Sequence, residues 1–73
     1  MVFLETITAM GESMLVPISS IQFILIRHRE DGWAIKIQGE YFECMEYFGD
    51  DEERLDKRYQ MIKKLLGVPE DSK

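Results

Sequence analysis

The sequence predicts an α+β fold: an antiparallel β-meander of four to five strands with one C-terminal amphipathic helix packed on one face. Short β-rich segments separated by Gly11, Asp31-Gly32 and Gly39-Glu40 predict the strands, and a helical period in the last third predicts the helix. A chain of 73 residues that is 45% hydrophobic suits a single core. We expect one compact domain over residues 1–68 and a frayed tail over residues 69–73.

The first part of the chain reads as a hairpin. Val2 to Ala9 is rich in β-branched and apolar residues, and Met10 to Ser13 forms a turn around a glycine that can take positive φ. Met14 to Ile18 is the return strand. Pro17 lacks an N–H, so this strand should be short or lie at a sheet edge. Ser19-Ser20 then forms a corner, because hydroxyl groups compete for backbone hydrogen bonds.

Ile21 to Arg29 is the strand around which the rest is arranged, because its apolar residues fall on both faces. Asp31-Gly32 after it predicts a two-residue type I′ hairpin, with Ile26 opposite Ile37 and His28 opposite Ile35. A three-residue loop over Glu30–Gly32 is the alternative. It would shift the pairing by one residue and exchange the two faces of the strand.

Gly39-Glu40 predicts a second tight hairpin, of type II′, which places Phe42 beside Ile37 and Cys44 beside Ile35. The two registers agree on which residues share a face. The helix-facing side collects Ile24, Ile26, His28, Trp33, Ile35, Ile37, Phe42 and Cys44. The other side, here called the second face, collects Phe23, Leu25, Arg27, Arg29, Ala34, Lys36, Gln38, Tyr41, Glu43, Met45 and Tyr47.

An amphipathic helix of about sixteen residues should close the domain. Asp50 is the expected N-cap, with Glu53 three residues later as in a capping box. Gly67 is the expected residue after the helix end. The apolar stripe comprises Leu55, Tyr59, Ile62 and Leu66, widened by Leu65.

Composition narrows the function classes. The single cysteine, Cys44, cannot form an intrachain disulfide, and the first residues lack the basic start of a signal peptide, so we expect a cytoplasmic protein. No apolar run approaches the roughly 20 residues of a membrane span. The net charge of −5 disfavours nonspecific binding to nucleic acid or to anionic lipid.

No phosphate loop, CxxC pair, HExxH or GxSxG motif is present in the sequence. His28 and Cys44 share a predicted face but lie on either side of a central strand, too far apart for a nucleophile–base pair. The acidic run Asp50–Glu53 is explained by a helix start rather than by a cation site. We therefore predict no catalytic residue, no metal and no cofactor, and a protein that is not an enzyme.

The second face is the predicted interaction surface, because it mixes apolar and cationic side chains. Its candidate residues are Phe23, Leu25, Arg27, Arg29, Lys36, Tyr41, Met45 and Tyr47. The first interpretation is a homodimer, or a contact with another protein, through this face or an exposed strand edge. The second is single-stranded nucleic-acid binding, in which bases stack on the rings and phosphates meet the cations. The overall acidity favours the first interpretation.

Overall fold

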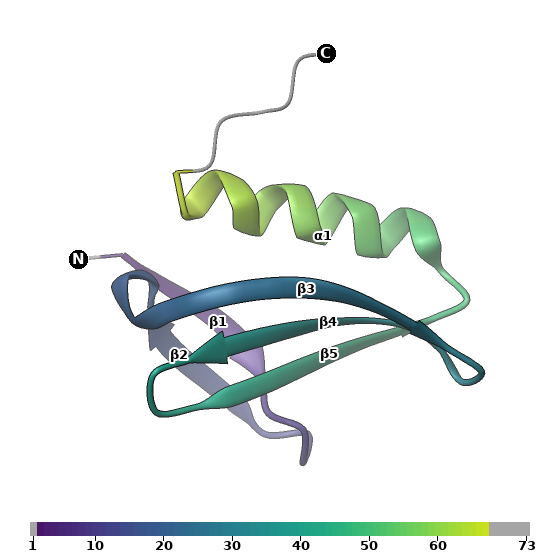
Figure 1. The fold of residues 1–73 in the computed structure, drawn as a ribbon, viewed down its shortest axis with the longest axis horizontal. Coiled ribbons are helices and arrows are strands. Elements are labelled where there is room, and N and C mark those ends of the chain that lie inside the picture. Colours follow the sequence, from purple (N-terminus) through teal and green to yellow (C-terminus); the bar gives the residue numbers. More distant parts are fainter. Residues whose placement is uncertain (1, 68–73) are drawn as a thin grey trace.

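The structure, a computed structural model, describes residues 2–67 and confirms the α+β fold (Figure 1). In chain order the elements are β1 Phe3–Ile7, β2 Ser13–Pro17, the short 3-10 helix η1 Ile18–Ser20, β3 Ile21–Arg29, β4 Gly32–Gly39, β5 Glu43–Gly49 and α1 Glu52–Leu65. The strands form an antiparallel pair, β1–β2, and a three-stranded antiparallel sheet in the order β3-β4-β5. The predicted tail, residues 69–73, lies outside the described residues.

The N-terminal hairpin joins the larger sheet at β5 and not at β3, the strand that follows it in the chain. Leu4 pairs with Val16 within the hairpin, as an antiparallel return strand requires. Just beyond β1, Thr8 forms an isolated antiparallel bridge with Cys44. The meander therefore covers β3 to β5, and the hairpin approaches its far edge (Figure 1).

The β3–β4 hairpin turns one residue earlier along the chain than the sequence predicted, which shifts the strand pairing by two residues. Arg29 pairs with Gly32 around a Glu30-Asp31 loop, so Ile26 lies opposite Ile35 and not opposite Ile37. Within residues 2–67 no non-glycine residue has positive φ, so the Glu30-Asp31 loop is not the predicted type I′ turn. A shift of two residues leaves every side chain on its predicted face, and the three-residue alternative is not observed.

Gly32 is instead the first residue of β4. It has φ +118°, and a Cβ atom there would lie 2.6 Å from the carbonyl oxygen of Gly49 in β5. Glycine is therefore needed for a close approach of two strands as well as for its backbone conformation.

The β4–β5 connection is longer than the predicted two-residue turn. Gln38 pairs with Glu43, and the amide of Gly39 donates to the carbonyl oxygen of Phe42 at 2.8 Å, which closes a four-residue loop. The Phe42 ring packs against Gly39 where a Cβ atom would lie. Gly39, which predicts a tight turn in the sequence, is required in the structure because the Phe42 ring occupies the space of a Cβ atom. The shift is again two residues, so Cys44 faces Ile37 and keeps its predicted side.

The core lies between the central sheet, the hairpin and α1, on the predicted helix-facing side. Its buried members are Leu4, Val16, Ile35, Ile37, Cys44, Leu55 and Ile62. Partly buried side chains from the same side, including Ile24, Trp33 and Phe42, pack around them. Ile26, on the outer strand, is 40% exposed.

Helix α1 begins one residue later than predicted, because Asp51 and not Asp50 is the N-cap. The Asp51 carboxylate accepts a hydrogen bond from the amide of Arg54 at 3.1 Å. Leu66 is the C-cap and Gly67, with φ +81°, follows it as predicted. Leu65 remains 39% exposed and does not widen the buried stripe. Within residues 2–67, this helix is too short and too polar to cross a membrane.

Candidate functional site

The second face is the side of the central sheet that α1 does not cover. Cross-strand pairing places Leu25, Lys36 and Met45 in one row. The adjacent row consists of Arg27, Ala34 and Tyr47. Ala34 and Met45 are 5% and 7% exposed, whereas Phe23 and Tyr47 are 47% and 64% exposed. The second face therefore has buried residues at its centre, Ala34 and Met45, and an exposed aromatic side chain on either side, Phe23 and Tyr47.

The cations of this face differ in their pairing. Lys36 lies 3.4 Å from the Glu43 carboxylate, so its charge is partly compensated. Within residues 2–67, neither Arg27 nor Arg29 makes an ion pair. Both arginines line a small hollow of about 80 Å³, together with Tyr47 and Asp31 among others. The basic character of the face is thus concentrated along β3.

Tyr41 is the predicted face residue that lies outside the three strands. It sits in the Gly39–Phe42 loop and is 90% exposed. The other seven candidates all belong to β3, β4 or β5, and their register places them on one side of the sheet.

His28 and Cys44 lie farther apart than the predicted register implied. His28 is exposed and stacks on Trp33, with ring centroids 3.9 Å apart and planes 9° from parallel. Cys44 is fully buried at the other end of the sheet, in line with Ile37 and Ile24. Burial, followed by the nearby carboxylates of Glu46 and Glu43, raises the pKa of the Cys44 thiol. This pair does not form a nucleophile and its base.

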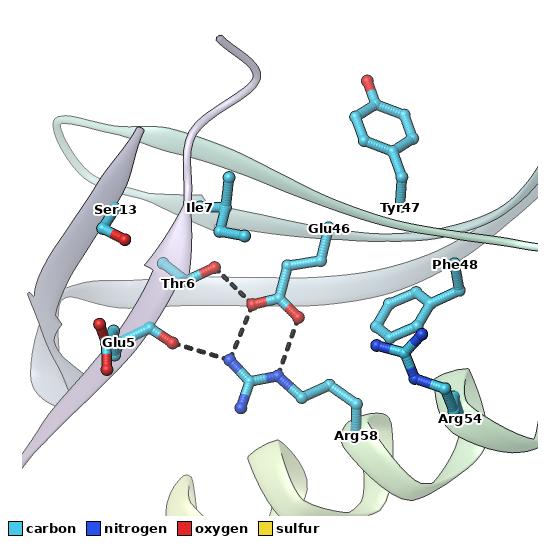
Figure 2. A pocket seen from close by; sticks show the side chains of 9 residues that line it. All are labelled: Glu5, Thr6, Ile7, Ser13, Glu46, Tyr47, Phe48, Arg54 and Arg58. Carbon is cyan, nitrogen blue, oxygen red and sulfur yellow. Dashed lines mark hydrogen bonds and ion pairs between the residues drawn. The ribbon is translucent and has the colours of Figure 1, made fainter. Parts of the chain in front are cut away.

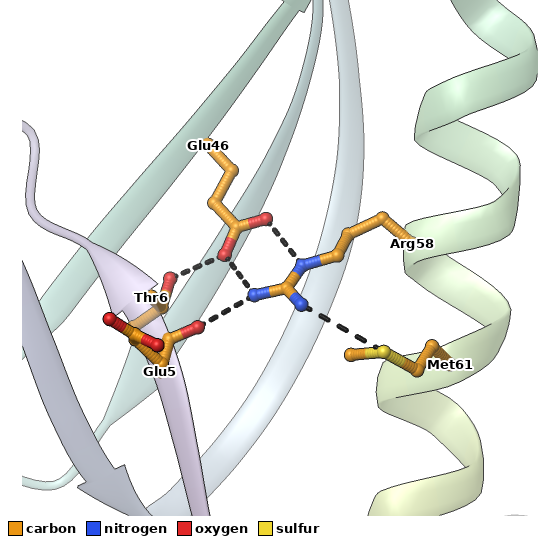
Figure 3. A network of polar contacts seen from close by, with 5 residues as sticks. All are labelled: Glu5, Thr6, Glu46, Arg58 and Met61. Atoms are coloured by element: carbon orange, nitrogen blue, oxygen red, sulfur yellow. Dashed lines mark hydrogen bonds and ion pairs between the residues drawn. The ribbon is translucent and has the colours of Figure 1, made fainter.

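An ion pair between the buried Glu46 and the partly buried Arg58 is the polar cluster that sequence reasoning missed (Figure 3). Arg58 donates from Nε to Oε1 and from Nη2 to Oε2 of Glu46, both at 2.8 Å. The Thr6 hydroxyl donates to Oε2 at 2.6 Å. Glu46 is 7% exposed and Thr6 is 2% exposed, so the carboxylate has left water and is held by three donated hydrogen bonds.

The cluster connects β1, β5 and α1 next to the isolated Thr8–Cys44 bridge, where β1 and β5 form no regular ladder. Besides binding Glu46 of β5, Arg58 of α1 donates from Nη2 to the backbone carbonyl of Glu5 in β1 at 2.7 Å. Arg58 Nη1 also lies 3.9 Å from the sulfur of Met61. The hydrogen bond to Glu46 raises the pKa of Arg58, against the opposing effect of burial. The guanidinium group thus links β5 to β1, which have no regular backbone pairing with each other.

An open cavity of about 330 Å³ lies beside this cluster (Figure 2). It is lined by Glu5, Thr6, Ile7, Ser13, Glu46, Tyr47, Phe48, Arg54 and Arg58. Arg54 lies over the Phe48 ring, 5.7 Å from its centroid. Within residues 2–67, every buried side-chain nitrogen or oxygen has a hydrogen-bond partner. Thr6 and Glu46, the buried polar residues at this cavity, are therefore hydrogen-bonded, which indicates a structural role.

Two signals in the sequence could have revealed the cluster. Arg58 follows Leu55 by three residues and precedes Ile62 by four, which places a cation within the apolar stripe of the helix. Glu46 continues the alternation of Phe42 and Cys44, which places a carboxylate on the helix-facing side. Two opposite charges at core positions of facing elements indicate a buried pair.

Among the residues that the structure describes, no three His, Cys, Asp or Glu side chains come together as metal ligands. A scan against protein-family models and searches of curated proteins and of solved structures found no match to this chain.

Proposed function

We propose that this protein is a small non-enzymatic interaction module that forms a homodimer through the second face. The observation that carries the proposal is the accessible apolar surface of Phe23 and Tyr47 on a side of the sheet opposite α1. Leu25 and Met45 lie between them in the sheet register. Apolar surface gathered on one open sheet face is a common feature of protein–protein contacts.

The open edge of β3 is the other route to a dimer. The nine-residue strand pairs with β4 on one side and, within residues 2–67, with no strand on the other. A long apolar edge can add a strand from a second chain. Ile26→Lys tests this route, because a lysine on an edge strand opposes edge-to-edge pairing.

We expect a dimer mass by light scattering at micromolar concentration and a folded monomer for Tyr47→Glu. Leu25→Glu should act in the same direction, although Leu25 is partly buried and Tyr47 is the cleaner site. A glutamate on the second face would have to be desolvated in the dimer, which opposes association.

Leu65→Glu is the matched control, since Leu65 is a similarly accessible apolar residue on α1 and should leave the dimer intact. Circular dichroism verifies that each variant is folded. A wild-type monomer at this concentration would refute the proposal. A dimer that survives Tyr47→Glu but dissociates in Ile26→Lys would move the interface to the edge of β3.

Single-stranded nucleic-acid binding is a second candidate, favoured because Arg27 and Arg29 make no ion pair with any described residue and lie beside the exposed Tyr47. It predicts binding of a labelled oligonucleotide at low salt that weakens steeply as salt is added, because counterions are released on binding. Arg27→Ala and Arg29→Ala should each weaken it in fluorescence anisotropy, whereas Lys57→Ala on α1 should not. An unchanged anisotropy at low salt would rule this candidate out.

A further inference from the structure

We infer that two copies pack second face to second face about a two-fold axis that runs along the strands between β4 and β5, so that Glu5 of each copy meets Arg27 of the other. This arrangement rests on the proposed homodimer and specifies its orientation. It also adds the outer side of the N-terminal hairpin to the interface.

The hairpin extends the second face beyond β5. The Thr8–Cys44 bridge and the Thr6–Glu46 hydrogen bond place the even-numbered residues of β1 on the helix-facing side. Because side chains alternate along a strand, Glu5 and Ile7 belong to the second face. Ile7 is 45% exposed, and both residues line the same cavity as Tyr47 (Figure 2). On the side away from α1, Glu5 and Ile7 thus follow Tyr47 of β5, although β1 belongs to a separate sheet that the isolated Thr8–Cys44 bridge links to β5.

Charge is distributed unevenly across this extended face. Arg27 and Arg29 lie on β3, at one side, and lack ion pairs within residues 2–67. Glu5 lies on β1, at the other side; its backbone carbonyl accepts a hydrogen bond from Arg58, and its carboxylate lies near enough to Arg58 to help raise the pKa of that guanidinium, but it makes no ion pair within residues 2–67. A second copy placed so that β3 lies over β1 brings opposite charges together twice, which is electrostatic complementarity.

A two-fold axis along the strands between β4 and β5 produces this superposition. It exchanges β3 with β1 and β4 with β5, so residues in the same row of the sheet meet across the interface. Arg27 meets Glu5 of the partner copy, and Leu25 meets Ile7. In the same way Ala34 meets Tyr47, and the stem of Lys36 lies on Met45. In this arrangement the cations Arg27 and Lys36 face a carboxylate and a thioether, and Leu25 and Ala34 face apolar or aromatic side chains.

Other two-fold axes are less favourable. An axis along β4 itself would place Lys36 against the Lys36 of the other copy. An axis perpendicular to the strands would stack β3 on β3 and gather the arginines of both copies. Like charges brought together at an interface oppose association. The charge pattern therefore selects the axis between β4 and β5.

A charge exchange tests the arrangement. Arg27→Glu alone places two acids together at both contacts, and Glu5→Arg alone places two bases together, so each variant should dimerise at least tenfold more weakly than the wild type. An equal mixture of the two variants should form a heterodimer, in which both contacts again join opposite charges. Native mass spectrometry distinguishes the heterodimer by mass, and sedimentation velocity gives the dissociation constants.

Ile7→Glu provides a test that does not depend on ion pairing. It should weaken the dimer as strongly as Tyr47→Glu, although Ile7 lies outside the three-stranded sheet. Wild-type strength for Glu5→Arg and Ile7→Glu, or no heterodimer in the mixture, would overturn this arrangement while leaving a dimer through the second face intact. A monomeric wild type would instead remove the proposed homodimer itself, so the two failures are distinguishable.

Discussion

Arg58→Ala is expected to lower the free energy of unfolding by about 3 kcal/mol, since removing one partner of a buried pair leaves the other charge uncompensated. The Glu46 carboxylate would keep only the Thr6 hydroxyl bond in an environment where its side chain is 8% exposed. For a domain of this size such a loss would lower the melting temperature by roughly 12–24 °C. Urea unfolding followed by circular dichroism at fixed protein concentration measures the change.

Arg54→Ala is the matched control, because Arg54 lies on the same helix, is exposed and contacts only the Phe48 ring through its cation. Its loss should cost about 1 kcal/mol or less. The double variant Glu46→Met with Arg58→Met should be more stable than either single variant, since it removes both charges together. Equal stability of Arg58→Ala and Arg54→Ala would show that the buried pair does not hold the fold.

Gly32→Ala is expected to destabilise the protein by about 3 kcal/mol, because the new Cβ atom meets backbone as well as an unfavourable φ. The carbonyl oxygen of Gly49 lies 2.6 Å from the position of that Cβ, and backbone atoms of a central sheet cannot move without disturbing the pairing of β4 with β5. Thermal unfolding measures the loss.

Gly49→Ala separates the cost of the positive φ from the cost of the close contact with backbone atoms. Gly49 also has positive φ, +58°, but a Cβ there has open space around it. The expected cost is therefore only the conformational one, about 1–2 kcal/mol. If the two alanine variants were equally stable, close contact between β4 and β5 would not be the reason for glycine at position 32.

The side of the sheet that each residue faces could be predicted from the sequence, whereas the turns could not. Alternation has a period of two, so Ile35, Ile37 and Cys44 were assigned to the core even though both hairpins were displaced. The observed pairings differ from the predicted ones because the prediction treats Gly32 and Gly39 as turn residues. In the structure Gly32 admits a neighbouring strand and Gly39 admits a phenylalanine ring. A glycine in sequence does not indicate which of these purposes it serves.

Local patterns point to the pairing of Glu46 with Arg58 but not to the contacts that Thr6 and Glu5 make with it, since those depend on where the hairpin attaches. Strand order in the chain suggests that β2 lies near β3, yet β1 approaches β5. Thr6 is 40 residues from Glu46, and Glu5 is 53 residues from Arg58. Pairings at such separations are set by the whole fold and not by any window of residues.

The attachment of the N-terminal hairpin also determines the order in which the structure can assemble. The pairs β1–β2, β3–β4 and β4–β5 each close over a few residues, so they can form early and independently. The bond from Arg58 to the Glu5 carbonyl must wait until the helix has settled on the sheet. The hairpin can therefore form its own strand pairing without the helix, whereas its contact with Arg58 requires the helix to be in place. Detachment of the hairpin would expose Leu4 and Val16, which belong to the same core as residues of β4, β5 and the helix.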